Sequence, residues 1–176
     1  MELDTRIAAL KGAIRDVPDF PKKGIVFKDI TTLLKDARLF REAMDLFTDL
    51  CRRARPDKIV AIESRGFILG AVLADRVGAG FVPVRKKGKL PGGKIAHTYE
   101  LEYGTDCLEI HEDALQRGER ALVVDDVIAT GGTAAATGHL VGQLGAELAG
   151  YAFLVELTFL KGRDRLQGEV FSLIRY

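Results

Sequence analysis

The chain has 176 residues, of which 47% are hydrophobic and 29% are charged, a composition typical of one globular domain. Its 26 Lys and Arg residues nearly balance 25 Asp and Glu residues, leaving a formal net charge of +1. Such a small net charge argues against a general nucleic-acid-binding surface, so we expect no nucleic-acid partner.

Other sequence features exclude further classes of protein. Cys51 and Cys107 lie far apart, and neither they nor the histidines have the spacing of a zinc site. The N-terminus lacks the apolar run of a secretory signal, and the longest nearly apolar run, residues 151–157, is too short to cross a bilayer. We expect a cytoplasmic protein with reduced thiols and no membrane partner.

Apolar spacing predicts the first elements of the chain. It indicates an amphipathic helix over residues 2–15 and another over residues 37–55, which ends before Pro56. Between them, residues 18–36 mix proline, glycine and lysine with a few apolar residues. This stretch is therefore expected to be extended or looped.

The remaining sequence alternates short apolar strands with helices. Strands are predicted at 58–62, 80–84, 120–124 and 148–157, helices at 67–76 and 133–144, and a hairpin-like pair at 95–103 and 107–111. This alternation indicates an α/β fold with a mostly parallel central sheet flanked by helices. Ligands of such sheets bind beyond the carboxyl ends of the strands.

The most informative segment is VVDDVIATGGT, residues 123–133, which is expected to be a loop from Asp125 onward that leads into a helix. Main-chain amides at a helix N-terminus can converge on one anion, and here they belong to Ala129, Thr130, Gly131, Gly132 and Thr133. A Walker loop is excluded because Thr133 stands where that motif requires Lys. The carboxylates of Asp125 and Asp126 can accept hydrogen bonds from a ribose diol or attract Mg²⁺. The segment thus predicts a site for a ribose 5-phosphate.

This segment resembles the phosphoribosyl pyrophosphate (PRPP) motif of type I phosphoribosyltransferases, and the form DDxxATGGT is that of the adenine phosphoribosyltransferases. Further segments are similar to that family in the same order: GIVFKDI at 24–30, SRGF at 64–67, VRKKGKLP at 84–91, YELEYG at 99–104 and VELT at 155–158. The resemblance implies a Mg²⁺-dependent homodimer of purine salvage. Such an enzyme transfers the 5-phosphoribosyl group from PRPP to N9 of adenine, giving AMP and pyrophosphate.

The resemblance also implies an organisation and a set of roles. One phosphoribosyltransferase domain, residues 1–176, would comprise a hood with the N-terminal helix (1–36) and a core (37–176) with a mobile lid at about 87–104. Pyrophosphate would be bound by Ser64, Arg65, Arg85 and Lys89, with a cis bond between Glu63 and Ser64 and with Arg85 reaching the neighbouring subunit's site. Mg²⁺ would be held mainly through PRPP, with Asp125 and Asp126 as candidate ligands.

Adenine would meet the backbone of Val26 and Lys28, the ring of Phe27, and Val127. Lys28 stands where the family usually has Arg, which a main-chain contact tolerates. The family's catalytic glutamate aligns with Glu102, and Tyr103 belongs to the lid. Ala129 stands where 6-oxopurine enzymes typically have Asp, which favours adenine.

Alternatives remain open at this stage. From the residues alone, Glu102 is a solvated glutamate on an alternating strand and Phe27 is a core residue. A phosphoribosyltransferase for another purine or for orotate would share most of these segments. A PRPP-sensing regulator without catalysis is a further alternative, although only about 20 residues precede the core-like region, too few for a winged helix, and the net charge gives no DNA-binding footprint.

Overall fold

The computed structural model describes residues 2–100 and 104–176, so Met1 and residues 101–103 lie outside the described part. The chain divides into two compact units, residues 1–46 and 47–176. The division falls within helix α3 (Ala37–Cys51), later in the chain than the expected end of the hood at residue 36.

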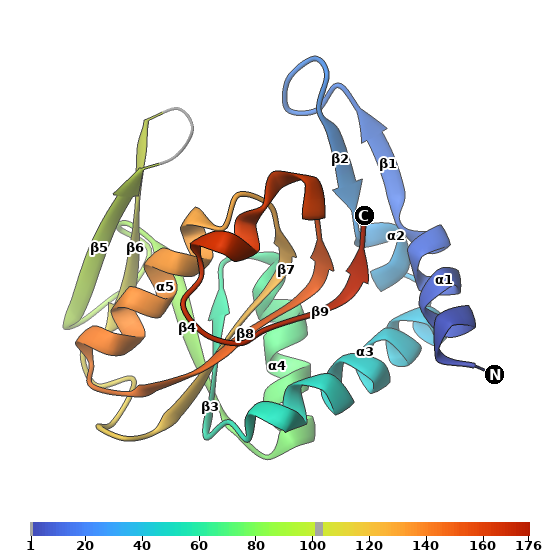
Figure 1. Cartoon of the computed structure of the whole chain (residues 1–176). Coiled ribbons are helices and arrows are strands. Elements are labelled where there is room, and N and C mark those ends of the chain that lie inside the picture. The colour runs from blue at the N-terminus through green and yellow to red at the C-terminus, as the bar shows by residue number, and fades with distance from the viewer. Residues whose placement is uncertain (1, 101–103) are drawn as a thin grey trace. The chain divides into compact units, whose positions relative to one another are not determined.

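The first unit contains a hairpin between short helices (Figure 1). Helix α1 (Leu3–Ala13) is followed by β1 (Arg15–Pro18), β2 (Val26–Asp29) and α2 (Thr31–Leu34). The two strands pair antiparallel, with Val17 opposite Phe27. The stretch expected to be extended or looped is therefore a hairpin followed by one helical turn.

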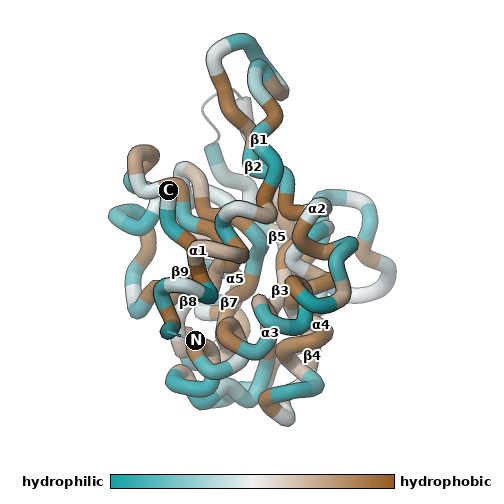
Figure 2. The backbone as a smooth tube through the Cα atoms, turned by 90° about the vertical axis from the view of Figure 1, so that its right-hand side faces the viewer, coloured by the Kyte–Doolittle hydropathy of each residue, from teal (hydrophilic) through white to brown (hydrophobic). Residues whose placement is uncertain are grey.

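Helix α3 is amphipathic, which explains why apolar spacing predicted it. Ala43, Met44 and Phe47 are buried, whereas Arg41 and Asp45 on the other side are exposed. Figure 2 shows the resulting alternation of hydrophobic and hydrophilic segments along this helix. A 3₁₀ turn, Arg52–Ala54, completes the predicted 37–55 stretch. Across the described residues, no helix is both long and apolar enough to span a bilayer.

Within the described part of the second unit, seven strands form one sheet in the order β5-β6-β4-β3-β7-β8-β9 (Figure 1). Their bounds are β3 Lys58–Ile62, β4 Gly80–Lys86, β5 Lys94–Glu100, β6 Thr105–His111, β7 Arg120–Ile128, β8 Glu147–Glu156 and β9 Val170–Arg175. The neighbouring strands β4, β3, β7, β8 and β9 are paired parallel to one another. At the edge of the sheet, β6 pairs antiparallel with both β4 and β5. The predicted mostly parallel α/β fold is confirmed, while β9 was not predicted.

Helices α4 (Arg65–Val77) and α5 (Gly132–Gln143) cover opposite faces of this sheet. A Cβ added to Gly70 of α4 would lie 2.6 Å from the Cβ of Ala61 on β3. The neighbouring Val60 instead belongs to the core cluster that contains Leu140 of α5. Because successive residues of a strand point to opposite faces, the two helices lie on different sides and both begin near the carboxyl ends of parallel strands.

Candidate active site

Strand β7 is longer than the sequence predicted. We expected it to end at residue 124, but pairing with β8 continues, with Asp125 opposite Phe153 and Ile128 opposite Glu156. The expected loop from Asp125 onward is therefore wrong in its first part. Val127 and Ile128 extend the apolar strand, so both aspartates lie within its paired end.

A pocket of about 100 Å³ lies where β7 gives way to α5. Its lining residues are Asp125, Val127, Ile128, Ala129, Thr130, Gly131, Gly132, Thr133, Ala134 and Phe153. Gly131, with φ of +82°, caps the helix N-terminus. Because the first-turn amides of a helix have no intrahelical acceptor, they are available to an anion. The structure thus brings the predicted phosphate-loop residues together around one small pocket.

The adjacent aspartates face different partners. Asp125 lines the pocket and lies against the first turn of α4, where a Cβ on Gly66 would be 2.8 Å from its Oδ1. Burial raises the pKa of Asp125 well above its ordinary value, and the neighbouring Asp126 carboxylate raises it further. Asp126, only 5% exposed, instead accepts a hydrogen bond from Nε of Arg65 at 2.5 Å. The two carboxylates are therefore not equivalent.

The segment between β3 and α4 carries the first residues predicted for pyrophosphate. The peptide bond between Glu63 and Ser64 is cis, as the resemblance implied. Ser64 is exposed at the N-cap of α4, and Arg65 begins the helix with its side chain 41% exposed. Both lie at the carboxyl edge of the sheet, but Arg65 is engaged with Asp126.

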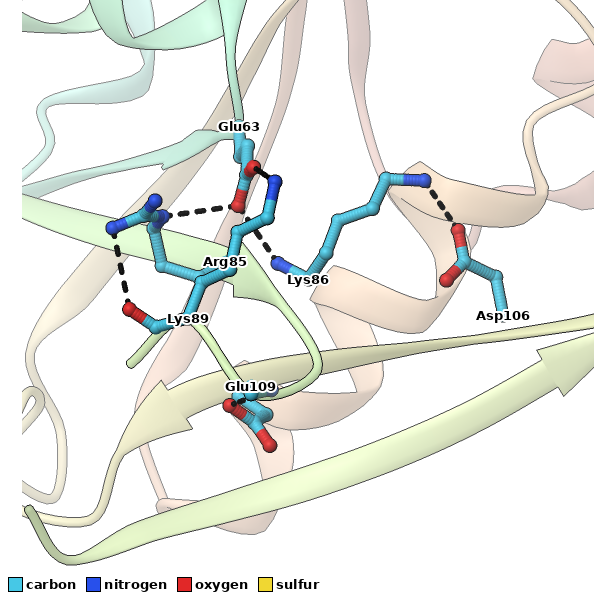
Figure 3. Close-up of polar contacts among 7 residues, drawn as sticks. Glu63, Arg85, Lys86, Lys89, Asp106 and Glu109 are labelled. Atoms are coloured by element: carbon cyan, nitrogen blue, oxygen red, sulfur yellow. Dashed lines mark hydrogen bonds and ion pairs between the residues drawn. The ribbon is translucent and has the colours of Figure 1, made fainter. Parts of the chain in front are cut away.

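The other predicted pyrophosphate residues converge on an acceptor that sequence reasoning missed. Nε of Arg85 and Nζ of Lys89 both donate to the carboxylate of Glu63, at 3.0 and 2.5 Å (Figure 3). The Lys86 side chain points away from this cluster and pairs with Asp106 at 2.5 Å (Figure 3). The available signal was an acidic residue directly after a buried strand, followed 22 residues later by a cation-rich segment.

The β5–β6 hairpin contacts helix α5 near the pocket. The hydroxyls of Tyr99 and Thr133 are 3.1 Å apart, and the rings of His97 and His139 have centroids 4.1 Å apart. Residues 94–100 of the predicted lid are thus a paired strand. The predicted Glu102 and Tyr103 lie outside the described residues.

The residues predicted to meet adenine in the hood belong to the first unit. Val26 is 46% exposed, and the ring of Phe27 packs edge-on against Phe20 with centroids 5.3 Å apart. Nζ of Lys28 donates to Asp16 at 2.6 Å. Val127, by contrast, lines the phosphate-loop pocket in the second unit.

Comparison with known proteins identifies the family. Residues 29–172 match the family described as phosphoribosyl transferase domain. An adenine phosphoribosyltransferase of Desulfitobacterium hafniense is 58% identical, over 93% of this chain and 95% of the relative. The chain belongs to the adenine phosphoribosyltransferase family.

Solved structures of adenine phosphoribosyltransferases share the whole fold. The Rhodothermus marinus structure has a TM-score of 0.93 at 52% identity, covering 98% of this chain and 99% of that one. The Saccharomyces cerevisiae structure, in complex with an iminoaltritol bisphosphate and adenine, has a TM-score of 0.93 at 46% identity, covering 97% and 99%. Membership of the adenine phosphoribosyltransferase family makes this chain an enzyme, so the reading as a non-catalytic regulator is set aside.

Proposed function

We propose that this enzyme transfers the 5-phosphoribosyl group from PRPP to N9 of adenine, releasing pyrophosphate and forming AMP in purine salvage. The observation that carries the proposal is the pocket between β7 and α5, which Asp125 lines together with the residues at the N-terminus of α5. Family membership supports the same reaction.

The phosphate loop would bind the 5′-phosphate. Amides of residues 129–133 and the positive end of the α5 dipole both favour an anion there, and the hydroxyls of Thr130 and Thr133 add donors. The volume of about 100 Å³ is well below the roughly 300–1,000 Å³ of pockets that enclose a whole drug-sized ligand. It therefore suits the phosphate end of PRPP, with Asp125 accepting hydrogen bonds from the ribose hydroxyls.

The pyrophosphate end of PRPP would meet Ser64, Arg65, Arg85 and Lys89. Guanidinium and ammonium groups stabilise the charge that develops on the leaving pyrophosphate, which is where catalysis of this transfer needs it. Arg85 reaching a neighbouring subunit's site remains part of the proposal.

Mg²⁺ would reach the site on PRPP. The described residues include no cluster of three or more His, Cys, Asp or Glu side chains placed to hold a metal, and Asp126 is engaged by Arg65. This donor set fits an ion bound mainly by diphosphate oxygens, with Asp125 and Asp126 as the carboxylates at hand. When bound, Mg²⁺ supplies further charge neutralisation of the pyrophosphate.

For adenine, the resemblance implies roles for Val26, Phe27 and Lys28 in the first unit, and separately for Val127 in the second. Glu102 would exchange a proton with the purine ring as N9 bonds to C1 of the ribose and pyrophosphate leaves. The lid, residues 87–104, would exclude water from the oxocarbenium-like transition state, because water would hydrolyse it.

A homodimer in the cytoplasm completes the proposal. Apolar surface around α4 and β4 supports association, since Ile68 is 45% and Phe81 39% exposed, and Phe81 packs edge-on against Phe67 at 5.8 Å.

The reaction is tested by pyrophosphate release from PRPP with adenine, hypoxanthine, guanine or no base, each with and without Mg²⁺. We expect release that requires both adenine and Mg²⁺. Faster release with hypoxanthine or guanine would instead support the alternative of a phosphoribosyltransferase for another purine.

A further inference from the structure

Glu63 binds the end of β4 and the turn that follows it. Its Oε1 accepts from Nζ of Lys89 at 2.5 Å, and its Oε2 accepts from Nε of Arg85 at 3.0 Å and from the Lys86 amide at 2.9 Å. Figure 3 shows these three donors, from the end of β4 and the turn after it, meeting at one carboxylate. Nη1 of Arg85 also donates to the carbonyl oxygen of Lys89 at 3.4 Å, which closes the cluster.

The carboxylate is built to stay charged. Its side chain is 10% exposed, and although burial opposes ionisation, the hydrogen bonds from Lys89, the Lys86 amide and Arg85 lower the pKa of Glu63 to about 2. A permanent anion thus lies between two cations at every physiological pH.

Apart from Glu63, Arg85 has only weaker contacts among the described residues, with the Lys89 carbonyl oxygen at 3.4 Å and with the Phe67 ring, whose centroid is 5.9 Å from Cζ. The Arg85 side chain is 33% exposed and that of Lys89 is 53% exposed, so both would sample many rotamers without a partner. Two uncompensated cations side by side would also repel each other. The hydrogen bonds to Glu63 fix both side chains before any ligand arrives, so binding pays less of the ordering entropy.

We propose that Glu63 is a positioning residue, which holds Lys89 in the arrangement that receives the pyrophosphate group and fixes Nε of Arg85, whose guanidinium would serve this site or the neighbouring subunit's. The inference rests on the proposed function, in which these two cations bind pyrophosphate. Glu63 acts through them and does not itself contact the anion.

The Glu63 carboxylate could also act in the opposite way and weaken pyrophosphate binding, so the direction of the change in affinity tests the proposal. A negative charge next to an anion site repels the ligand, so a carboxylate that only competed for Lys89 would weaken pyrophosphate binding. Removing the charge would then tighten binding. A positioning role predicts the reverse.

The matched control is Glu109, which is also buried and also binds this turn. One of its carboxylate oxygens, Oε2, accepts from the Gly88 amide at 3.1 Å, on the other side of the turn from Glu63 (Figure 3). Glu109→Gln keeps an acceptor for that amide while removing a carboxylate from the same neighbourhood. It therefore shows how much pyrophosphate affinity changes when a nearby negative charge is lost or the turn is perturbed, without any loss of contact to Lys89 or Arg85.

The experiment is calorimetric titration of the full chain with inorganic pyrophosphate and Mg²⁺, and separately with AMP, which lacks the pyrophosphate group. We expect Glu63→Gln to weaken pyrophosphate binding by about 10- to 100-fold, the range for losing a hydrogen bond to a charged group, and to leave AMP binding unchanged. Glu63→Asp should recover part of the loss, and Glu109→Gln should bind as the parent does.

Retained AMP binding also shows that each variant is folded. Unchanged or tighter pyrophosphate binding by Glu63→Gln would overturn the inference, as would an equal loss in Glu109→Gln. Lys89→Ala tests separately whether Lys89 binds pyrophosphate, which is the proposed function on which the inference rests. If Lys89→Ala weakens pyrophosphate binding and Glu63→Gln does not, only the inference fails; if neither does, both fail.

Discussion

Gly131 and Gly162 are in direct backbone contact, so the phosphate loop is held against a turn that lies far away in the sequence. A Cβ on Gly162 would lie 2.9 Å from the amide nitrogen of Gly131 and closer still to the carbonyl oxygen of Ala129. The turn is fixed in place by Arg163, which donates to Glu156 at 2.7 and 2.9 Å and to the Val170 carbonyl at 2.7 Å. No side chain fits between the loop and this support.

Gly162→Ala is therefore expected to displace the phosphate loop. The added methyl group must push against main-chain atoms, which cannot move aside as a flexible side chain can. We expect the KM for PRPP to rise by about tenfold or more, a loss of about 1.4 kcal/mol of binding, while the KM for adenine changes little. Steady-state kinetics with each substrate varied in turn measures both values.

Gly142→Ala, at the other end of α5, is the control for that substitution. A Cβ at Gly142 would meet no atom within 4 Å, and alanine is the better helix former by about 1 kcal/mol. This variant should keep the parent's KM for PRPP and be at least as stable. Equal kinetics for the two variants would show that the contact with Gly162 does not matter to the loop.

Asp125→Asn tests the ribose contact. The amide keeps the size of the side chain but replaces one acceptor oxygen with a donor, at a position that lines the phosphate pocket. We expect PRPP binding to weaken by about 10- to 100-fold and adenine binding to stay close to that of the parent. Fluorescence or calorimetric titration with each substrate distinguishes the two, and equal weakening of both would count against the contact.

Much of this site could be predicted from the sequence because its parts are local. The phosphate loop is one continuous segment whose glycines, threonines and position after an apolar strand carry the signal. The same locality explains why β3 was predicted with its observed bounds, Lys58–Ile62.

The parts that escaped prediction depend on partners distant in the chain. Strand β9 is recognised by its parallel pairing with β8. The different surroundings of Asp125 and Asp126 became clear only from the pairing with β8, which shows that β7 continues past both residues. The contact of Gly162 with the phosphate loop has no local pattern, since one glycine after a lysine is typical of many turns.

Glu102→Gln tests the residue assigned to proton exchange. If its carboxyl group exchanges a proton with the purine ring, the amide should slow turnover by about 10²- to 10⁴-fold, the usual cost of losing a general acid or base. PRPP should still bind, because the phosphate loop and the cations are unchanged. Unchanged turnover would remove Glu102 from the mechanism.

The partial burial of His97, together with its contact with His139, makes the free energy of unfolding depend on pH. Burial, and then the neighbouring His139, lowers the pKa of His97 below 6.5 in the folded protein. The unfolded chain therefore binds more protons near that pH, so stability is lost as the pH falls through about 6.5 and is kept above it. Thermal unfolding of the parent should occur at a lower temperature at pH 5.5 than at pH 7.5, and His97→Gln should reduce that difference.

An NMR titration of the imidazole signals gives the matching direct measurement. The His97 ring should titrate below the ordinary value of 6.5. A value above 6.5 would reverse the sign of the stability argument and contradict it.

The central claim is that the main-chain amides of residues 129–133, which lead into the N-terminus of α5, bind the 5′-phosphate of the sugar. The most direct test is a crystal structure of the protein with AMP. We expect the phosphate within hydrogen-bonding distance of the amides of residues 129–133 and the ribose hydroxyls next to Asp125. A phosphate bound by another part of the chain, with this pocket empty, would contradict the claim.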